Sequence, residues 1–252
     1  MCIGPKYADG KLWKYLLKDS VLWKLNAIIF YMYFKHARVC KVVLNFQPSE
    51  LNRSAVDYCD CRIAGHNCNN PVDSCLKIDS YGKTDYKKLG YEIRDNNVEI
   101  SNKLRNNGLL LLRVTSTKRF IELCHCCSCC CIPLIIQRLL IRSGLKYRAI
   151  SPSDYYPVLL LEKCDNCRAC IKVCPLNDGT ARDNIIRSRE CLGCGLCALQ
   201  CSKNAIKMKK RPTIVKSKSS TRFQSLFIYY FTTIYLLFQS ALFKISNPVV
   251  SR

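Results

Sequence analysis

Residues 164–175 read CDNCRACIKVCP, and residues 191–201 read CLGCGLCALQC. Both stretches have the spacing Cys-x2-Cys-x2-Cys-x3-Cys. Two intervening residues let the chain turn between cysteines, so that three successive thiolates face one centre while backbone amides point at the sulfurs. The spacing is typical of thiolate ligands for a 4Fe-4S cluster, and a zinc site is the weaker alternative.

The fourth iron of each cluster needs a more distant ligand, which in two-cluster proteins is the fourth cysteine of the other run. The first cluster is then assigned to Cys164, Cys167, Cys170 and Cys201, and the second to Cys191, Cys194, Cys197 and Cys174. No acid or histidine near these cysteines is arranged for proton transfer, so we assign no catalytic residue. We expect the unit to relay single electrons through two [4Fe-4S] clusters.

These motifs resemble the two-cluster bacterial ferredoxins over about Val158 to Lys210. The resemblance implies an α+β, pseudo-twofold ferredoxin-like domain at 155–211. Its expected elements are a first strand at Val158–Leu161, a middle hairpin near Ile185–Arg187 and a closing strand at Ala205–Met208. The chain departs from the family at two places. Ser202 follows Cys201 where proline is usual, and Leu176-Asn177-Asp178-Gly179 replaces the usual small apolar residues at the start of a helix.

Cysteine is unusually common, with 20 cysteines in 252 residues. The first apolar run, 25–34, is followed by basic residues without a small-residue cleavage site, so we expect no signal peptide. Thiols in a chain that is not exported serve metals and electrons instead of disulfides, which favours a cytoplasmic location. Cys2 and Cys40 stand apart and are expected to be ordinary thiols.

Ten further cysteines are candidate metal ligands: Cys59, Cys61, Cys68, Cys75, Cys124, Cys126, Cys127, Cys129, Cys130 and Cys131. Adjacent cysteines point in different directions, so the run at 124–131 cannot bind one ion with all its thiols. We expect it to meet the upstream four in space. The alternatives are one or two further Fe-S clusters, a structural zinc site with four cysteines or three and His66 or His125, and redox-active thiols.

The upstream elements Cys59-Asp60-Cys61-Arg62 and Asn70-Pro71-Val72-Asp73-Ser74-Cys75, with the run at 124–131, resemble a second family. It contains uncharacterised ferredoxin-type proteins of archaea and bacteria and extends the similarity to about 55–211. The resemblance implies no settled reaction. Arg62 is expected to support a turn or to donate a hydrogen bond toward a cluster.

The chain before residue 155 is expected to be mixed and mostly helical. Residues 1–50 carry apolar residues at helical spacing and predict an amphipathic helical segment. Residues 51–150 form the cysteine-rich metal-binding region, with loops at 51–80, a helix at 98–107 stopped by Gly108, a buried strand at 109–114 and a helix at 132–141.

The net charge is +22, from 40 basic and 18 acidic residues. Residues 223–243 contain no charge and are long enough to span a bilayer, so they are a candidate transmembrane helix, with a buried or interfacial helix as the alternative. Basic residues before this segment would place the clusters on the cytoplasmic side. The same charge favours an acidic redox partner or an anionic membrane, whereas the lack of interleaved aromatics argues against nucleic acid.

Together these features predict an iron–sulfur electron-transfer protein, with an additional metal centre in the cysteine-rich region. The alternative is an oxidoreductase subunit in which the upstream cysteines form a catalytic cluster or dithiol that the ferredoxin unit supplies with electrons. A non-catalytic electron carrier or redox-complex subunit is the favoured interpretation.

Overall fold

The computed structural model describes residues 25–26, 28–29, 32, 38–44, 49, 54–65, 67–79, 84–116, 120–142, 144, 148–177, 190–212 and 234–235. Within these ranges the protein is mixed α and β, with two antiparallel sheets and few helices. No helix in the described part of the chain has the length and hydropathy needed to cross a bilayer. The candidate transmembrane helix, most of the segment 1–50 and the expected hairpin at 185–187 lie outside the described residues.

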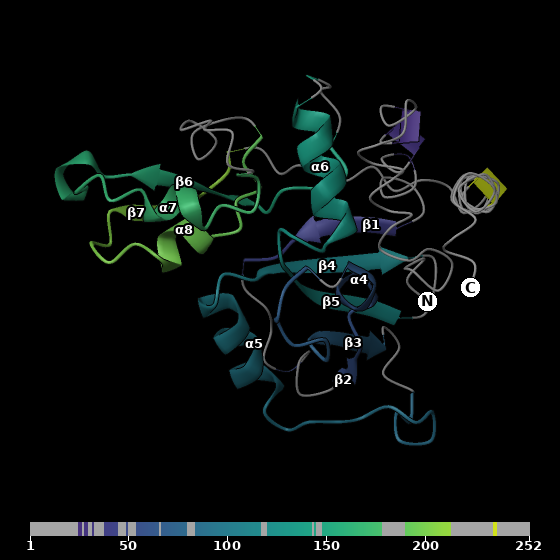
Figure 1. Ribbon diagram of the computed structural model, residues 1–252. Helices are drawn as coiled ribbons and strands as arrows, with labels where there is room; N and C mark the ends of the chain where they lie inside the picture. Colours follow the sequence, from purple (N-terminus) through teal and green to yellow (C-terminus); the bar gives the residue numbers. More distant parts are fainter. Residues whose placement is uncertain are drawn as a thin grey trace.

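The larger sheet has five antiparallel strands in the order β1-β4-β5-β3-β2 (Figure 1). Its strands are β1 (Arg38–Val42), β2 (Ser54–Asp57), β3 (Cys75–Asp79), β4 (Leu110–Ser116) and β5 (Phe120–Cys126). The three helices associated with it are α4 (Asp60–Gly65), α5 (Asn97–Asn106) and α6 (Ile132–Arg142). The central strands β4 and β5 are the longest. The cysteine run begins in the last residues of β5, in the middle of the sheet, and continues beyond this strand.

The two faces of this sheet differ in chemistry because side chains alternate along each strand. Cys75 lies opposite Cys124, and Cys124 lies opposite Leu112, so these three side chains share one face. Helix α6 covers this cysteine face, since its Leu134 and Leu140 belong to the same hydrophobic core as Leu112. The cysteines are therefore part of the wall of a packed core.

The opposite face packs against α5. Val98 of this helix contacts the cluster that contains Leu111 and Leu123, and Ser101 bonds His125 of β5. Helix α5 ends at Asn106 and is capped by Asn107, and the φ of 84° at Gly108 suits the left-handed position that follows a helix cap. The helix expected at 98–107, the strand at 109–114 and the helix at 132–141 are confirmed with small shifts in their ends.

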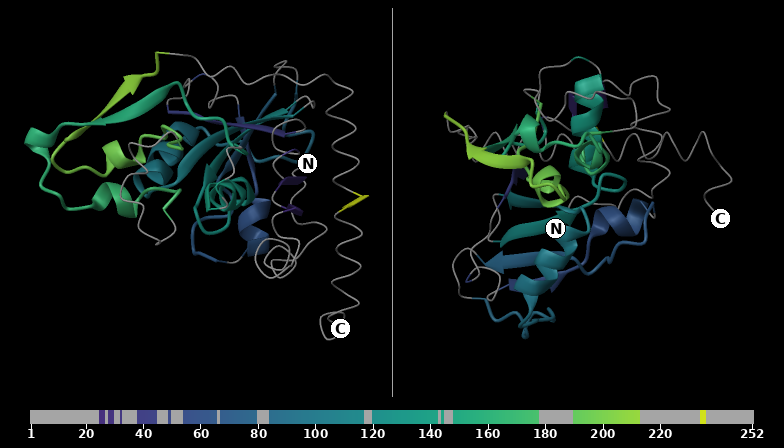
Figure 2. Two further views of the ribbon diagram at one scale, coloured as in Figure 1. Left: turned by 90° about the horizontal axis from the view of Figure 1, so that it is seen from above. Right: turned by 90° about the vertical axis from the view of Figure 1, so that its left-hand side faces the viewer.

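A smaller unit lies beside the larger sheet, as both views of Figure 2 show. Strand β6 (Tyr155–Leu159) pairs antiparallel with β7 (Ile206–Lys210). β6 overlaps the expected first strand at 158–161, and β7 overlaps the expected closing strand at 205–208. Between them are a 3-10 turn, η3 (Leu161–Lys163), and the helices α7 (Ala169–Lys172) and α8 (Leu196–Leu199).

The two units share one hydrophobic core. Leu176, Leu192 and Leu196 of the smaller unit belong to the same buried cluster as Val42 and Leu110 of the larger sheet. A salt bridge of 3.1 Å from Lys41 Nζ to Asp154 Oδ1 adds a polar link at the edge of β1. The smaller unit is therefore held in a defined position against the sheet.

Two expectations for the cysteine-rich region are wrong. Residues 51–80 are not a loop region but contain β2, α4 and β3, and the region as a whole is built on a sheet instead of being mostly helical. Cys124 and Cys126 of the cysteine run belong to β5. All five residues of β3 are buried, with Cys75, Lys77 and Asp79 on one face and Leu76 and Ile78 on the other.

The packing of α6 on the sheet can be tested with Leu134→Ala. Leu134 is 0% exposed, so its truncation leaves a cavity, and we expect the free energy of unfolding to fall by about 2–5 kcal/mol. Leu89→Ala is the control, because Leu89 is 59% exposed and its loss should change stability by less than about 0.5 kcal/mol. Urea unfolding of the metal-loaded protein under anaerobic conditions measures both, and equal effects would contradict the packing of α6.

Candidate metal centres

The two cysteine motifs of the smaller unit adopt the same backbone conformation. In the first motif Asn166 and Arg168 have φ values of 58° and 59°. Gly193 and Gly195, at the corresponding positions of the second motif, have φ values of 66° and 78°. Each loop then enters a short helix, α7 or α8. Residues other than glycine rarely adopt positive φ, so its repetition indicates a loop conformation that both motifs require.

The second motif surrounds a small cavity of about 20 Å³. Its cysteines Cys191, Cys194 and Cys197 line this cavity together with Cys174, which comes from the first motif. A side chain at residue 193 would overlap the carbonyl oxygen of Tyr155, so only glycine allows the loop to approach β6 this closely. The four thiols that the spacing assigns to the second cluster thus share one cavity.

Burial and mutual repulsion govern the thiols of this cavity. Burial raises the pKa of Cys194, and the neighbouring Cys174, Cys197 and Cys191 raise it further, although a backbone amide lowers it. The sulfur of Cys191 accepts a hydrogen bond of 3.4 Å from the backbone N–H of Gly193. Amides directed at sulfur and crowding of thiolates both suit a bound cationic centre.

The cysteines of the first motif lie nearer the surface. Cys170 is close to Cys167 and Cys164, and burial followed by these two charges raises its pKa. Cys201 follows α8, and its sulfur accepts a hydrogen bond of 3.3 Å from the backbone N–H of Ala205. Cys197 lies near Cys170, so the two sets of thiols adjoin each other in the smaller unit.

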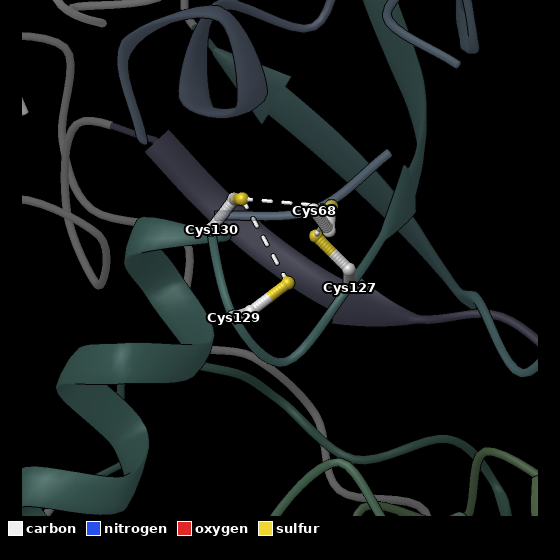
Figure 3. A group of neighbouring side chains, drawn as sticks. All are labelled: Cys68, Cys127, Cys129 and Cys130. Carbon is white, nitrogen blue, oxygen red and sulfur yellow. Dashed lines mark hydrogen bonds between the residues drawn. The ribbon is translucent and has the colours of Figure 1, made fainter. Parts of the chain in front are cut away.

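A separate group of four cysteines forms where the larger sheet ends. Cys127, Cys129 and Cys130 belong to the turn after β5, and Cys68 comes from the loop after α4; their four sulfurs face one another (Figure 3). All four sulfurs lie within 4.8 Å of one another. This four-cysteine group can hold a metal ion.

The distances within the four-cysteine group match a single tetrahedral ion. Cys68 Sγ is 3.8 Å from Sγ of both Cys127 and Cys130, and Cys129 Sγ is 3.8 Å from Cys130 Sγ. Four thiolates at about 2.3 Å from a tetrahedral zinc ion are separated by about 3.8 Å. Disulfides are excluded, because all described cysteines have free thiols and a disulfide would need about 2.05 Å. A four-iron core would hold its thiolates further apart.

The protonation of the four-cysteine group is uneven. Burial raises the pKa of Cys68, but hydrogen bonds from Asn70 and from neighbouring thiols lower it by more, to about 6. Burial raises the pKa of Cys130 to about 12, with the nearby Cys127 adding to the shift. The Cys68 thiolate therefore forms readily, whereas Cys130 requires a cation to replace its proton.

Arg62 lies beside the four-cysteine group and is 2% exposed. Its guanidinium donates hydrogen bonds to Pro71 O, to Ser74 Oγ at 2.7 Å and to His125 O at 2.8 Å. Burial lowers the pKa of Arg62, but nearby thiolates, led by Cys59, raise it by more. The side chain ties α4 to the cysteine loops and brings a positive charge to them.

His125 is not a ligand of the four-cysteine group, contrary to one of the alternatives considered. Its side chain lies on the other face of β5, where Nε2 bonds Ser101 Oγ at 2.6 Å and Nδ1 bonds Ser74 O at 2.6 Å. Burial, followed by the charges of Arg105 and Arg62, outweighs the Ser74 bond and lowers the pKa of His125 to about 4. His66 lies outside the described residues.

The remaining six candidate cysteines of the larger sheet do not join this group. A second cavity, on the cysteine face of the sheet, is lined by Cys59, Cys61, Cys75, Cys124, Cys126 and Cys131, and Cys127 and Cys130 of the four-cysteine group also reach it. Cys40 of β1 lines the same cavity and is 1% exposed, although the sequence placed it among ordinary thiols. That Cys40 lies near these thiols follows only from the strand order, in which β1 is next to β4.

Comparison with known proteins adds no relative to this description. No family model, curated protein or solved structure matches the chain. The chemistry of the thiol groups therefore has to be argued from their spacing, distances and surroundings.

The bridging role of Arg62 can be tested with Arg62→Met. The substitution leaves buried carbonyl and hydroxyl acceptors without their donor and removes a charge beside the thiols, so we expect the free energy of unfolding to fall by about 2–5 kcal/mol. Arg62→Lys should recover only part of this loss, because one ammonium group lacks the planar fork that reaches all three acceptors. Thermal and urea unfolding measure the change.

Arg94→Met is the matched control for Arg62. Arg94 pairs with Asp73 and Glu92, but its side chain is 25% exposed. Ion pairs of this kind contribute about 1 kcal/mol or less. A loss of stability in Arg94→Met as large as that in Arg62→Met would show that burial of the Arg62 network has no special importance.

Proposed function

We propose that the protein is an electron carrier that relays single electrons through two [4Fe-4S] clusters held by the smaller unit. The observation that carries this proposal is the cavity whose walls bring Cys174 together with Cys191, Cys194 and Cys197. A thiol from the first motif joins three from the second, which is the exchange of ligands that two-cluster ferredoxins use. When bound, the clusters supply reversible one-electron chemistry.

The chain surrounds these thiols with groups that suit electron transfer. Leu192 and Leu196 are buried in the cavity wall and exclude water from it. The guanidinium of Arg211 donates a hydrogen bond of 3.0 Å to Cys191 O. Burial raises the pKa of Cys191, whereas Gly193 N–H and the charges of Arg211 and Arg148 lower it. Positive charge here favours the more negative, reduced state and so raises the reduction potential of this site.

The surface of the smaller unit favours an acidic redox partner. Residues 162–211 contain eleven basic and five acidic side chains. Electrostatic complementarity accelerates encounter with a surface of opposite charge. The unit would therefore dock a protein whose own redox centre lies beneath an acidic patch.

For the four-cysteine group we propose a structural zinc ion. Sulfur separations of 3.8 Å suit one tetrahedral ion with four thiolate ligands. Such a site has no open coordination position for a substrate, so the group gives no support to the alternative of a catalytic centre fed by the clusters. Its ligands join the loop after α4 to the turn after β5, and metal binding would stabilise the sheet at this end.

The exchange of ligands predicts that Cys174→Ser damages the second cluster although Cys174 belongs to the first motif. We expect anaerobically purified Cys174→Ser to lose the EPR signal of one reduced cluster and up to about half of the iron in the smaller unit, because a thiolate at the fourth iron is missing. Leu199→Ala, at a 48% exposed position of α8, should keep both signals. Retention of two unaltered cluster signals in Cys174→Ser would refute the assignment.

The zinc proposal predicts a separate loss in Cys129→Ser. We expect about one zinc per chain in the unaltered protein and much less in the variant, because a tetrahedral site loses one of its four thiolates. Ser128→Ala changes the neighbouring side chain of the same turn and should keep its zinc. Elemental analysis measures both, and iron in place of zinc in the unaltered protein would contradict the identity of the metal.

A further inference from the structure

The cavity on the cysteine face of the larger sheet is lined by more thiols than a single ion can use. Cys127 and Cys130 of the four-cysteine group reach this cavity, and seven further cysteines line it: Cys40, Cys59, Cys61, Cys75, Cys124, Cys126 and Cys131. They come from separate parts of the fold: the β2–α4 connection, α4, the strands β1, β3 and β5, and the residue before α6. The folding of the sheet, and not a local motif, therefore brings these thiols together.

Five of these thiols form a continuous series of contacts. Hydrogen bonds link Cys59 to Cys75, Cys75 to Cys124, Cys124 to Cys126, and Cys126 to Cys131. Cys75 and Cys124 are cross-strand partners, and Cys126 projects to the same face two residues further along β5. The series follows the wall of the cavity and does not converge on one point, which distinguishes it from the four-cysteine group.

The cavity itself argues against simple packing of small apolar side chains. Its volume is about 50 Å³, whereas a site for one water needs about 10–15 Å³ by this measure. Protein cores are close-packed and leave few such spaces. Cys75, Cys126 and Cys131 are at most 7% exposed, so the space lies against buried sulfurs. It is large enough for a core of several atoms.

Arg62 provides a second, independent observation at this cavity. It lines the wall between the cavity and the four-cysteine group, and its Nε atom is buried with no hydrogen-bond partner among the described residues. A buried donor without an acceptor is costly, and an anionic group in the cavity would relieve the cost. Three of its other hydrogen bonds go to neutral acceptors, and Cys127 of the four-cysteine group is a further partner of its side chain.

We propose that this cavity binds an additional iron–sulfur cluster, with ligands drawn from Cys59, Cys75, Cys124, Cys126 and Cys131. Thiolates select zinc, copper(I) and iron–sulfur cores. Single zinc or copper ions need converging sulfurs, whereas a cluster fills a space of several atoms and reaches sulfurs that lie around it. An anionic thiolate cluster also supplies the negative charge that Arg62 faces. The site is distinct from the two clusters of the smaller unit and does not depend on them.

The decisive experiment compares iron and acid-labile sulfide in the unaltered full chain and in two double variants, all purified anaerobically. The unaltered protein should contain more iron than the about eight atoms of the two [4Fe-4S] clusters. Cys75→Ser combined with Cys124→Ser should lose this additional iron while both EPR signals of the smaller unit remain. Cys164→Ser combined with Cys191→Ser should lose those signals but keep the iron of the cavity.

The matched control is Cys129→Ser, which alters the four-cysteine group and should lose zinc but keep its iron. If the double variant fails to fold, two measurements that leave the paired strands intact provide the test. They are Mössbauer spectroscopy of the unaltered protein and iron analysis of the single variant Cys59→Ser. The proposal is overturned if iron content is unchanged in Cys59→Ser and in the double variant, or if they lose zinc or copper instead. Iron absent from the smaller unit but present in the cavity would refute the proposed electron relay alone.

Discussion

The organisation of the larger sheet depends on the alternation of side chains along β5. Cys124 and Cys126 point to one face, whereas Leu123 and His125 point to the other. The strand is followed by a turn that brings Cys127, Cys129 and Cys130 together with Cys68. One segment of eight residues thus supplies sulfurs to two different places. A shift of one residue in the pairing of β5 would exchange its thiols with His125 and destroy both arrangements.

Arg62 explains why the two thiol groups of the sheet can lie so close together. With metal bound as proposed, each set of thiolates would carry negative charge, and two such sets in a buried region would repel each other. The guanidinium stands between them, held by Pro71, Ser74 and His125, so its position does not depend on the metals. An arginine suits this role better than a lysine, because its fork donates to several acceptors and keeps its charge when buried.

The sequence predicted the parts of the molecule that rest on local rules. Cysteine spacing identified the two motifs of the smaller unit, and apolar spacing with Gly108 or Pro133 identified α5 and α6. It missed β2 and β3, because the strands are short and because polar residues and one thiol occupy buried positions in them. It could not separate Cys68, Cys127, Cys129 and Cys130 from the other candidates. That division depends on strand order and on which residues lie opposite each other, which no spacing along the chain reveals.

The shared core relates the position of the smaller unit to the metal chemistry of the sheet. Leu176 follows Cys174, and Leu192 and Leu196 lie between the cysteines of the second motif, yet all three pack in the core with Leu110 and α6. Helix α6 itself begins directly after Cys131. Any loosening of the sheet cavity would therefore be transmitted through α6 to the leucines that enclose Cys191, Cys194 and Cys197. Since these leucines exclude water, and exposure to solvent is one determinant of cluster potential, the proposed metal sites of the sheet would be physically coupled to the potential of the proposed second cluster.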